Sequence, residues 1–177
     1  MRKKETTKEN ILEGAYQLMI SEGFSQLTAR KIAKKISIST QPIYLNFDNM
    51  KVLKDTLFLN TMENVERKFF KDTQSITEFA LSYYHFANAK HDLFLSLITD
   101  KETILPTYQF FYKLFRKGIW NDTVLSDKSS KIIYARTIGV ITSIVHSDNS
   151  NIDEISMEKL ISELIIQDIA TLQNNTF

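Results

Sequence analysis

Polar and basic side chains between residues 28 and 51 combine the groups that proteins use to contact nucleic acid. The amide of Gln41 can pair bidentately with adenine, and the methyl group of Thr40 can contact the methyl group of thymine. Hydroxyl, guanidinium and ammonium groups suit phosphate oxygens, which fix the register without reading the sequence. The candidate DNA-binding residues are Thr28, Arg30, Ser39, Thr40, Gln41, Tyr44 and Lys51.

Two short helices joined by a polar turn are predicted to position these side chains. Thr28 has the residue type of a helix N-cap, and an apolar stripe at helical spacing follows it. Beyond the turn, Ser39 is predicted to cap a second helix, with Pro42 in its first turn, where a missing N–H costs little. Tyr44 then points away from the inward-facing positions of that helix, beside Gln41.

A longer helix, from about residue 7 to residue 22, is predicted to precede them. Thr6 and Glu9 have the spacing of a capping box, and Gly23 is placed to end the helix in a left-handed conformation. Three helices in this order form a helix-turn-helix unit. The second short helix of such a unit enters the major groove with its N-terminal residues near the base edges.

The charge distribution agrees with a nucleic-acid-binding segment at one end of the chain. Residues 1–51 hold nine Lys and Arg against five Asp and Glu, for a net charge of +4. The remainder holds 13 basic and 16 acidic residues, for a net charge of −3. A basic head on a mildly acidic body suits a polyanion-binding module, although a chance division of charge is the alternative.

The apolar and turn residues of the head follow a fixed pattern over about residues 7–53. This pattern resembles the DNA-binding domain of the TetR family of bacterial transcriptional regulators. The positions that carry the resemblance are Ile11, Ala15, Leu18, Gly23, Phe24, Thr28, Ile32, Ala33, Ile38, Ser39, Ile43, Tyr44, Phe47 and Leu53. The resemblance implies a homodimer with a DNA-binding domain at residues 1–50 and a helical effector-binding and dimerisation domain at residues 51–177.

The chain departs from the family pattern at three positions. Ser37 stands where the family usually has Gly in the turn, and Ser tolerates a left-handed backbone less well. Met50 stands where the family usually has Lys, and the neighbouring Lys51 is the candidate to take over that phosphate contact. Ile36 is larger than the small residue expected at its position.

The rest of the chain also follows the helical period, so the predicted fold class is all-α. The predicted helices beyond the head span about 49–70, 76–90, 92–99, 104–117, 127–146 and 152–173. No apolar stretch approaches the roughly 20 residues that span a bilayer, so no membrane association is expected. The absence of Cys excludes disulfides and fits a reducing cytosol, so the expected location is cytoplasmic.

Aromatic residues are abundant in the body and have two interpretations. One is an apolar pocket with a few hydroxyl groups, which suits a hydrophobic or aromatic effector. The other is that the rings fill the core between helices, since helical spacing alone yields this pattern. The candidate pocket residues are Phe79, Tyr83, Phe86, Phe111, Tyr112, Phe115, Trp120 and Tyr134.

The last two predicted helices are apolar on more than one face. A helix that is apolar over so much of its circumference must bury two sides. One side can pack on the same chain and the other on a second copy, giving a four-helix bundle across a two-fold axis. The candidate interface residues are Ile138, Ile141, Val145, Ile161, Leu164, Ile165 and Ile169. The alternative is that both helices are buried wholly within one subunit.

The sequence predicts neither an enzyme nor a metal or cofactor site. The three His residues are scattered, with no i,i+4 pair and no Cys. The expected function is a DNA-binding transcriptional regulator, most often a repressor in this family, which a small and largely apolar effector releases from a palindromic operator. The alternatives are a regulator controlled by a protein partner and a helical ligand-carrying dimer that does not bind DNA.

Overall fold

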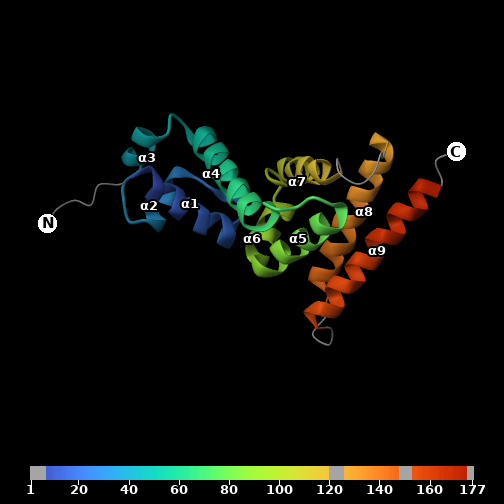
Figure 1. The fold of residues 1–177 in the computed structure, drawn as a ribbon. Coiled ribbons are helices and arrows are strands. Elements are labelled where there is room, and N and C mark those ends of the chain that lie inside the picture. The colour runs from blue at the N-terminus through green and yellow to red at the C-terminus, as the bar shows by residue number, and fades with distance from the viewer. Residues whose placement is uncertain (1–6, 120–125, 148–152, 175–177) are drawn as a thin grey trace. The chain divides into compact units, whose positions relative to one another are not determined.

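A computed structural model describes residues 7–119, 126–147 and 153–174 of the chain. The regular structure within these ranges is entirely helical, which confirms the predicted all-α class (Figure 1). The α-helices are α1 (Lys8–Glu22), α2 (Ala29–Lys35), α3 (Gln41–Asn46), α4 (Met50–Val65), α5 (Ile76–Ala89), α6 (His91–Thr99), α7 (Ile104–Ile119), α8 (Asp127–His146) and α9 (Glu154–Asn174). A 3₁₀ turn, η1 (Phe24–Gln26), follows α1, and a π-helical turn, η2 (Glu66–Phe70), continues α4.

The helices form two compact units that do not follow the chain order. The first unit is Met1–Asn64 with Asp92–Thr107, and the second is Val65–His91 with Tyr108–Phe177. Helix α6 and the start of α7 therefore pack with the N-terminal helices, although α5 separates them in sequence. The predicted boundary at residue 50 concerns function, which this division by packing does not test.

The core of the first unit comes from the positions that the helical period identifies. Helix α1 buries its apolar stripe, α2 and α3 bury their inward-facing residues, and α4 contributes one residue per turn of its inner face. The buried residues are Ile11, Ala15, Leu18, Met19, Ile32, Ala33, Ile43, Phe47, Leu53 and Leu57. Burial of this stripe, rather than helix propensity, holds helices as short as α2 and α3 in place.

Two helix starts lie one residue later than the sequence indicates. The N-cap of α1 is Thr7, whose Oγ1 accepts a hydrogen bond from the N–H of Asn10 at 3.3 Å; the predicted cap, Thr6, lies outside the described residues. The N-cap of α3 is Thr40, which has a helical backbone and makes no side-chain capping bond. The prediction that Ser39 caps this helix is therefore wrong, because the first intrahelical bonds go to the carbonyl of Thr40.

The turn between α2 and α3 uses a left-handed residue. The N–H of Ile38 donates to the carbonyl of Ala33 at 2.9 Å, and the N–H of Ser37 donates to that of Lys34 at 3.3 Å. This pair of bonds is the Schellman motif, which needs a positive φ at its central residue. Ser37 supplies it with φ +59°, and among the described non-glycine residues no other φ is positive. The family's glycine position thus keeps its conformation here with a Ser side chain, at a cost in strain.

Helix α6 is attached to α1 and η1 by polar contacts within the first unit. The buried hydroxyl of Ser96 donates to the carbonyl of Met19 at 3.0 Å. The carboxylate of Asp100 accepts from the N–H of Ser25 at 2.7 Å and from the N–H of Glu102 at 2.9 Å. Burial opposes the charge on Asp100, but these N–H donors outweigh it and hold the pKa of the carboxyl below its ordinary value. The turn after α6 therefore fixes the turn after α1.

The second unit is built around α5, which packs against η2, α8 and α9. Helix α5 starts at Ser75, whose side chain accepts from the N–H of Glu78, and it buries apolar residues over much of its surface. The described residues contain no helix long and apolar enough to cross a membrane.

Candidate nucleic-acid interface

Helix α3 presents an exposed face beside a buried one. Ile43 and Phe47 are 1% and 2% exposed and anchor the helix to the core. Gln41 is exposed, Tyr44 is 54% exposed and Leu45 is 77% exposed. The alternation follows the helical period, because residues 43 and 47 lie on the face opposite to that of the other three. This helix therefore has the anchored inner face and free outer face that groove recognition requires.

Four of the seven predicted residues line one surface hollow between the start of α2, α3 and the start of α4. Thr28, Arg30, Tyr44 and Lys51 share this hollow with Met50. Residues 28 and 51 are far apart in the sequence, so only the fold brings them together. A hydroxyl, a guanidinium, a phenol and an ammonium group on one hollow are suited to successive phosphate oxygens of a DNA strand.

The remaining predicted residues lie elsewhere around α3. Ser39 and Gln41 line a second hollow together with Leu45, Lys35 at the end of α2 and residues of α1. Thr40, at the N-cap, is half-buried. The structure therefore separates the candidates into a group suited to phosphates and a group at the start of α3 suited to base edges.

The basic side chains of the head differ in how far they are already paired. Lys31 pairs with Glu22 at 2.8 Å, and Lys54 pairs with Glu102 at 2.8 Å. Lys51 pairs with Asp55 at 2.6 Å, but both side chains are largely exposed, so the pair is weak and can exchange for a phosphate. Arg30 is exposed and has no ion pair with a described residue. Arg30 is thus available for DNA, as are the exposed Lys34 and Lys35, which have no ion pair with a described residue either.

Thr28 serves both the fold and the candidate site. Its Oγ1 accepts from the N–H of Lys31 at 3.3 Å and caps α2. The hydroxyl proton remains available to a phosphate oxygen, because a hydroxyl can accept and donate at once. The capped helix start also keeps a free N–H in the same place.

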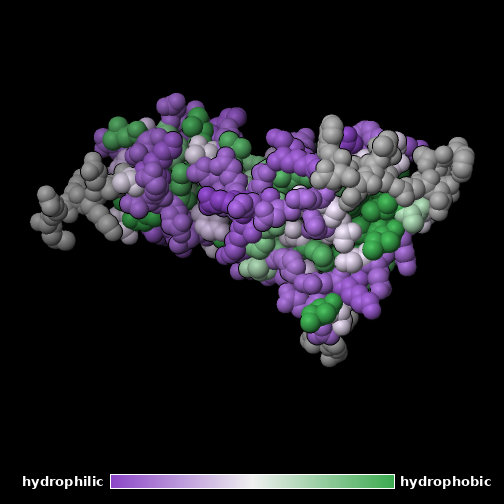
Figure 2. Space-filling view, in the orientation of Figure 1, coloured by the Kyte–Doolittle hydropathy of each residue, from purple (hydrophilic) through white to green (hydrophobic). Residues whose placement is uncertain are grey.

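Leu45 is a candidate contact that the sequence analysis did not select. Its side chain is the most exposed large apolar group of the first unit. Figure 2 shows hydrophobic residues over α3 on the face that it draws. Apolar side chains in the major groove contact the methyl group of thymine. The sequence contains the signal, since residues 41, 44 and 45 share a helical face.

The aromatic residues predicted to line a pocket lie mostly inside the second unit. Phe79, Tyr83, Phe86, Phe111, Phe115 and Tyr134 are all 3% exposed or less, Tyr112 is half-buried, and Trp120 lies outside the described residues. Their rings contact one another, with centroids 5.3 Å apart for Phe79 and Phe115 and 5.0 Å apart for Tyr83 and Phe111. They therefore form a packed aromatic cluster, and an effector would have to displace rings to enter it.

The polar groups of this aromatic cluster are neutral hydroxyls. Burial raises the pKa of Tyr83 to about 12, although a hydrogen bond with Thr142 opposes the shift. Burial also raises the pKa of Tyr134, whose hydroxyl donates to the carbonyl of Tyr108 at 2.8 Å. On α8 the buried hydroxyls of Ser130 and Thr137 have no hydrogen-bond partner within the described part of the chain. Such groups cost free energy when they are left unpaired.

The predicted dimer residues do not all face outward. Ile141, Ile161 and Ile165 are 4% exposed or less within the single chain, because α5 packs against both α8 and α9. These three residues therefore pack within the single chain, and their assignment to an interface stays a prediction. Ile138, Val145 and Ile169 are half-buried, and Leu164 is 37% exposed. The other exposed large apolar residues of the two helices are Ile132, Val140, Ile155, Leu160 and Ile166.

Comparison with known proteins decides the nature of the head. Residues 11–57 match the family model of bacterial regulatory proteins of the tetR family. The head is therefore similar to the DNA-binding domain of the TetR family. The match covers α1 to the first half of α4, which includes every predicted DNA-binding residue. It confirms the resemblance of the head that the spacing of apolar residues indicated.

Solved structures share the fold of the whole chain. FadR from Bacillus subtilis, in complex with stearoyl-CoA, has a TM-score of 0.60 at 17% identity and covers 92% of this chain and 99% of its own. NalD, the secondary repressor of a multidrug efflux pump in Pseudomonas aeruginosa, has a TM-score of 0.62 at 15% identity, over 91% and 94%. FadR from Bacillus halodurans has a TM-score of 0.58 at 19% identity, over 93% and 97%. No curated protein sequence matches the chain.

Proposed function

We propose that this TetR-family protein is a repressor that binds a palindromic operator as a homodimer and is released by a small, largely apolar effector. The observation that carries the proposal is α3, a short helix with a buried inner face and exposed Gln41, Tyr44 and Leu45. An exposed helix of this kind beside unpaired Arg30 fits the major groove and its flanking phosphates. The regulator acts where the operator lies, in the bacterial cytoplasm.

The side chains divide into two groups by role. Thr40, Gln41 and Leu45 are the proposed base-reading residues, and Ser39 lies beside them at the start of α3. Thr28, Arg30, Tyr44 and Lys51 are the proposed phosphate contacts, because they line one hollow beside α3. Loss of a base-reading group changes the sequence preference, whereas loss of a phosphate contact weakens binding to all sequences alike.

The exposed apolar residues of α8 and α9 support dimerisation. Leu160, Leu164 and Ile166 leave apolar area uncovered on α9, and Ile132 and Val140 do so on α8. Figure 2 shows a hydrophobic patch over these two helices. A second copy that packs the same helices against this patch would form a four-helix bundle. The two-fold axis would set two α3 helices about 34–36 Å apart, one turn of DNA.

The aromatic cluster supports an apolar effector. The similar FadR structure from Bacillus subtilis contains stearoyl-CoA. In this chain, a ligand that displaces rings and carries one or two polar groups could also pair with the hydroxyls of Ser130 and Thr137, which have no partner among the described residues. Phe70 ends the segment that runs from α4 through η2, and its ring lies 5.5 Å from those of Phe79 and Phe111. A ligand that moves Phe70 would therefore act on α4, whose first turn holds the proposed phosphate contact Lys51.

Selection of bound sequences from random DNA by the purified protein tests the proposal. We expect the selected sequences to share a palindromic consensus. We also expect the logarithm of the affinity to fall linearly with the logarithm of the salt concentration. Absence of enrichment together with a salt slope near zero would instead favour the ligand-carrying dimer. A palindromic consensus, bound with an affinity that no apolar compound lowers, would favour control by a protein partner.

A further inference from the structure

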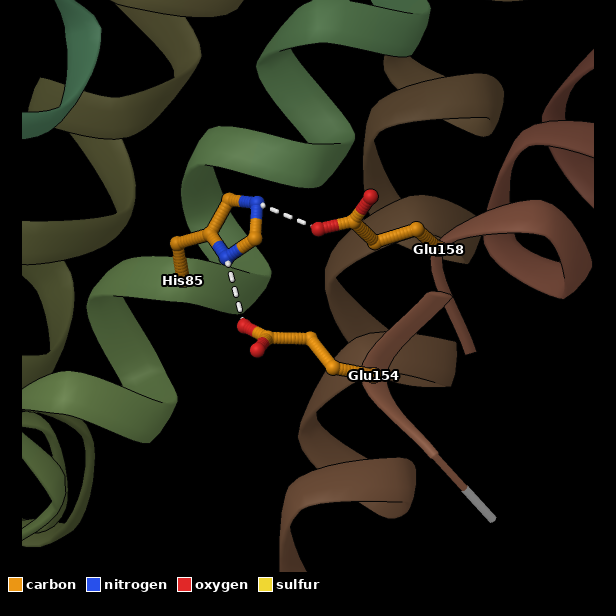
Figure 3. Close-up of side chains that lie close together, drawn as sticks. All are labelled: His85, Glu154 and Glu158. Carbon is orange, nitrogen blue, oxygen red and sulfur yellow. Dashed lines mark ion pairs between the residues drawn. The ribbon is translucent and has the colours of Figure 1, made fainter. Parts of the chain in front are cut away.

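Helices α5 and α9 bring together three metal-ligating side chains that lie far apart in the sequence. His85 lies on α5, and Glu154 and Glu158 lie one turn apart on α9 (Figure 3). The Nε2 atom of His85 lies 3.2 Å from Glu158 Oε1, and its Nδ1 atom lies 3.6 Å from Glu154 Oε1. All three ligand atoms lie within 4.8 Å of one another. All three residues belong to the second unit.

The electrostatic balance of this cluster is negative. Neither carboxylate has a Lys or Arg within ion-pair distance among the described residues; the imidazole is the only charge partner of both. Two carboxylates together carry two negative charges, which a divalent cation would neutralise.

The distance between His85 and Glu158 suits two ligands of one ion, and Glu154 lies beside the other ring nitrogen of His85. With metal–ligand bonds of about 2.1 Å, adjacent ligand atoms are separated by about 3.0 Å in octahedral and about 3.4 Å in tetrahedral geometry. The 3.2 Å between Nε2 of His85 and Oε1 of Glu158 falls between these values. Glu154 has a side chain that is 67% exposed, so it can swing to the Nε2 side without disturbing the core. One nitrogen and two oxygen ligands favour a transition-metal ion of the zinc class over Ca²⁺ or Mg²⁺.

We propose that His85, Glu154 and Glu158 bind one divalent transition-metal ion such as Zn²⁺, with water at its remaining positions. The ion ties α5, the central helix of the second unit, to α9. Without the ion, the same groups form an ion pair when the imidazole is protonated.

Titration of the full-length protein with Zn²⁺, followed by calorimetry in competition with a chelator, tests the site. The expected result is one ion per chain and a higher melting temperature with zinc. His85→Ala and the double variant Glu154→Gln/Glu158→Gln should each weaken binding by at least about ten-fold. The Gln side chains match Glu in size on an exposed surface, so the double variant keeps the fold even if His85→Ala does not.

Two matched variants complete the design. Glu163→Gln removes another exposed carboxylate from α9, one that faces Lys159, and it should leave the affinity unchanged. His91→Ala tests the other pair of close imidazoles, since the rings of His91 and His146 lie 6.2 Å apart. Lack of zinc binding by the wild type overturns the proposal. Full affinity in the Gln double variant, or loss of affinity in His91→Ala alone, also overturns it.

Discussion

Ile36 packs its Cγ2 methyl group against the backbone of Gly14, so closely that a Cβ on Gly14 would overlap that methyl group. Gly14 lies in the middle of α1 and is buried, and Ile36 is the C-cap of α2. The unusually large residue in the turn is therefore accommodated by the absence of a side chain on the facing helix. The two helices of the head approach each other at this contact.

Gly14→Ala should destabilise the protein by about 1–3 kcal/mol, as other overpacked sites do. The sign is informative, because Gly→Ala inside a helix ordinarily stabilises by about 0.5–1 kcal/mol. Combining Gly14→Ala with Ile36→Ala should recover the stability relative to Ile36→Ala alone. Urea unfolding of the four proteins in this cycle measures the coupling, and additive effects would contradict the contact.

Ser37→Gly should stabilise the protein by about 0.5–1 kcal/mol, because it relieves the strain of a positive φ at a residue with a Cβ. Ser39→Gly is the matched control, since Ser39 is also exposed but has no positive φ. Its substitution should leave the free energy of unfolding unchanged or lower it. Equal effects of the two changes would mean that the turn is not strained by the side chain of Ser37.

Gln41→Ala and Arg30→Ala should weaken operator binding in different ways. The Gln41 change should cost about 1–3 kcal/mol at one base pair and relax the preference there. The Arg30 change should weaken binding to all sequences nearly equally. It should also lower, by about one unit, the slope of the logarithm of affinity against the logarithm of salt concentration. Binding measurements on a panel of single-base operator variants at several salt concentrations separate the two. An unchanged preference in Gln41→Ala would remove that residue from base reading.

Leu45→Ala should weaken binding to operators that carry thymine at the contacted position. It should leave the stability of the protein unchanged, since the side chain is 77% exposed. The contrasting variant is Ile43→Ala. Ile43 lies on the opposite, buried face of α3 and is 1% exposed, so its substitution should lower stability by about 2–5 kcal/mol. Thermal unfolding and the same operator panel distinguish a DNA contact from a packing residue. If Leu45→Ala unfolds the head, the contact assignment fails.

Asp100 should make the attachment of α6 dependent on pH. Its pKa is lower in the folded protein than its ordinary value of 3.8, so the carboxylate contributes stability above that value. The contribution is lost as the pH falls through the lowered pKa and the carboxylate is protonated. Asp100→Asn should therefore cost about 1 kcal/mol at pH 7 and progressively less in acid. Unfolding of both proteins between pH 7 and pH 2.5 checks this, and a pH-independent difference would contradict it.

Ile166→Asp should weaken dimerisation by at least ten-fold, because a charge cannot be buried without a partner in an apolar interface (about 2 kcal/mol or more). Ile166 is 58% exposed on α9, so the change should leave the fold of the chain intact. Leu59→Asp, at an equally exposed position on α4, is the control and should leave the association unchanged. Analytical ultracentrifugation over a range of concentrations measures both. A dimer that survives Ile166→Asp would place the interface elsewhere.

Most of this fold can be predicted from the sequence, because the helical period of apolar residues and the capping residues at helix ends are local features. The stripe of Ile11, Ala15 and Leu18 identified the inner face of α1, and Asp127–His146 was predicted with the bounds that α8 has. Errors at the caps amount to one residue, because Ser, Thr and their neighbours compete for the same role at a helix start. The outer face of α3 was likewise predictable, since Ile43 and Phe47 fix its orientation.

By itself, the sequence determined the all-α class, the helix-turn-helix and the outer face of α3, because these depend on local spacing and on short-range capping. Only the tertiary structure decided which apolar residues of α8 and α9 are buried, since that choice depends on where α5 lies against both. It also decided that Ile36 needs Gly14, and that His85 meets Glu154 and Glu158. These contacts join residues from separate helices, and their distances are set by packing rather than by any periodicity of the chain.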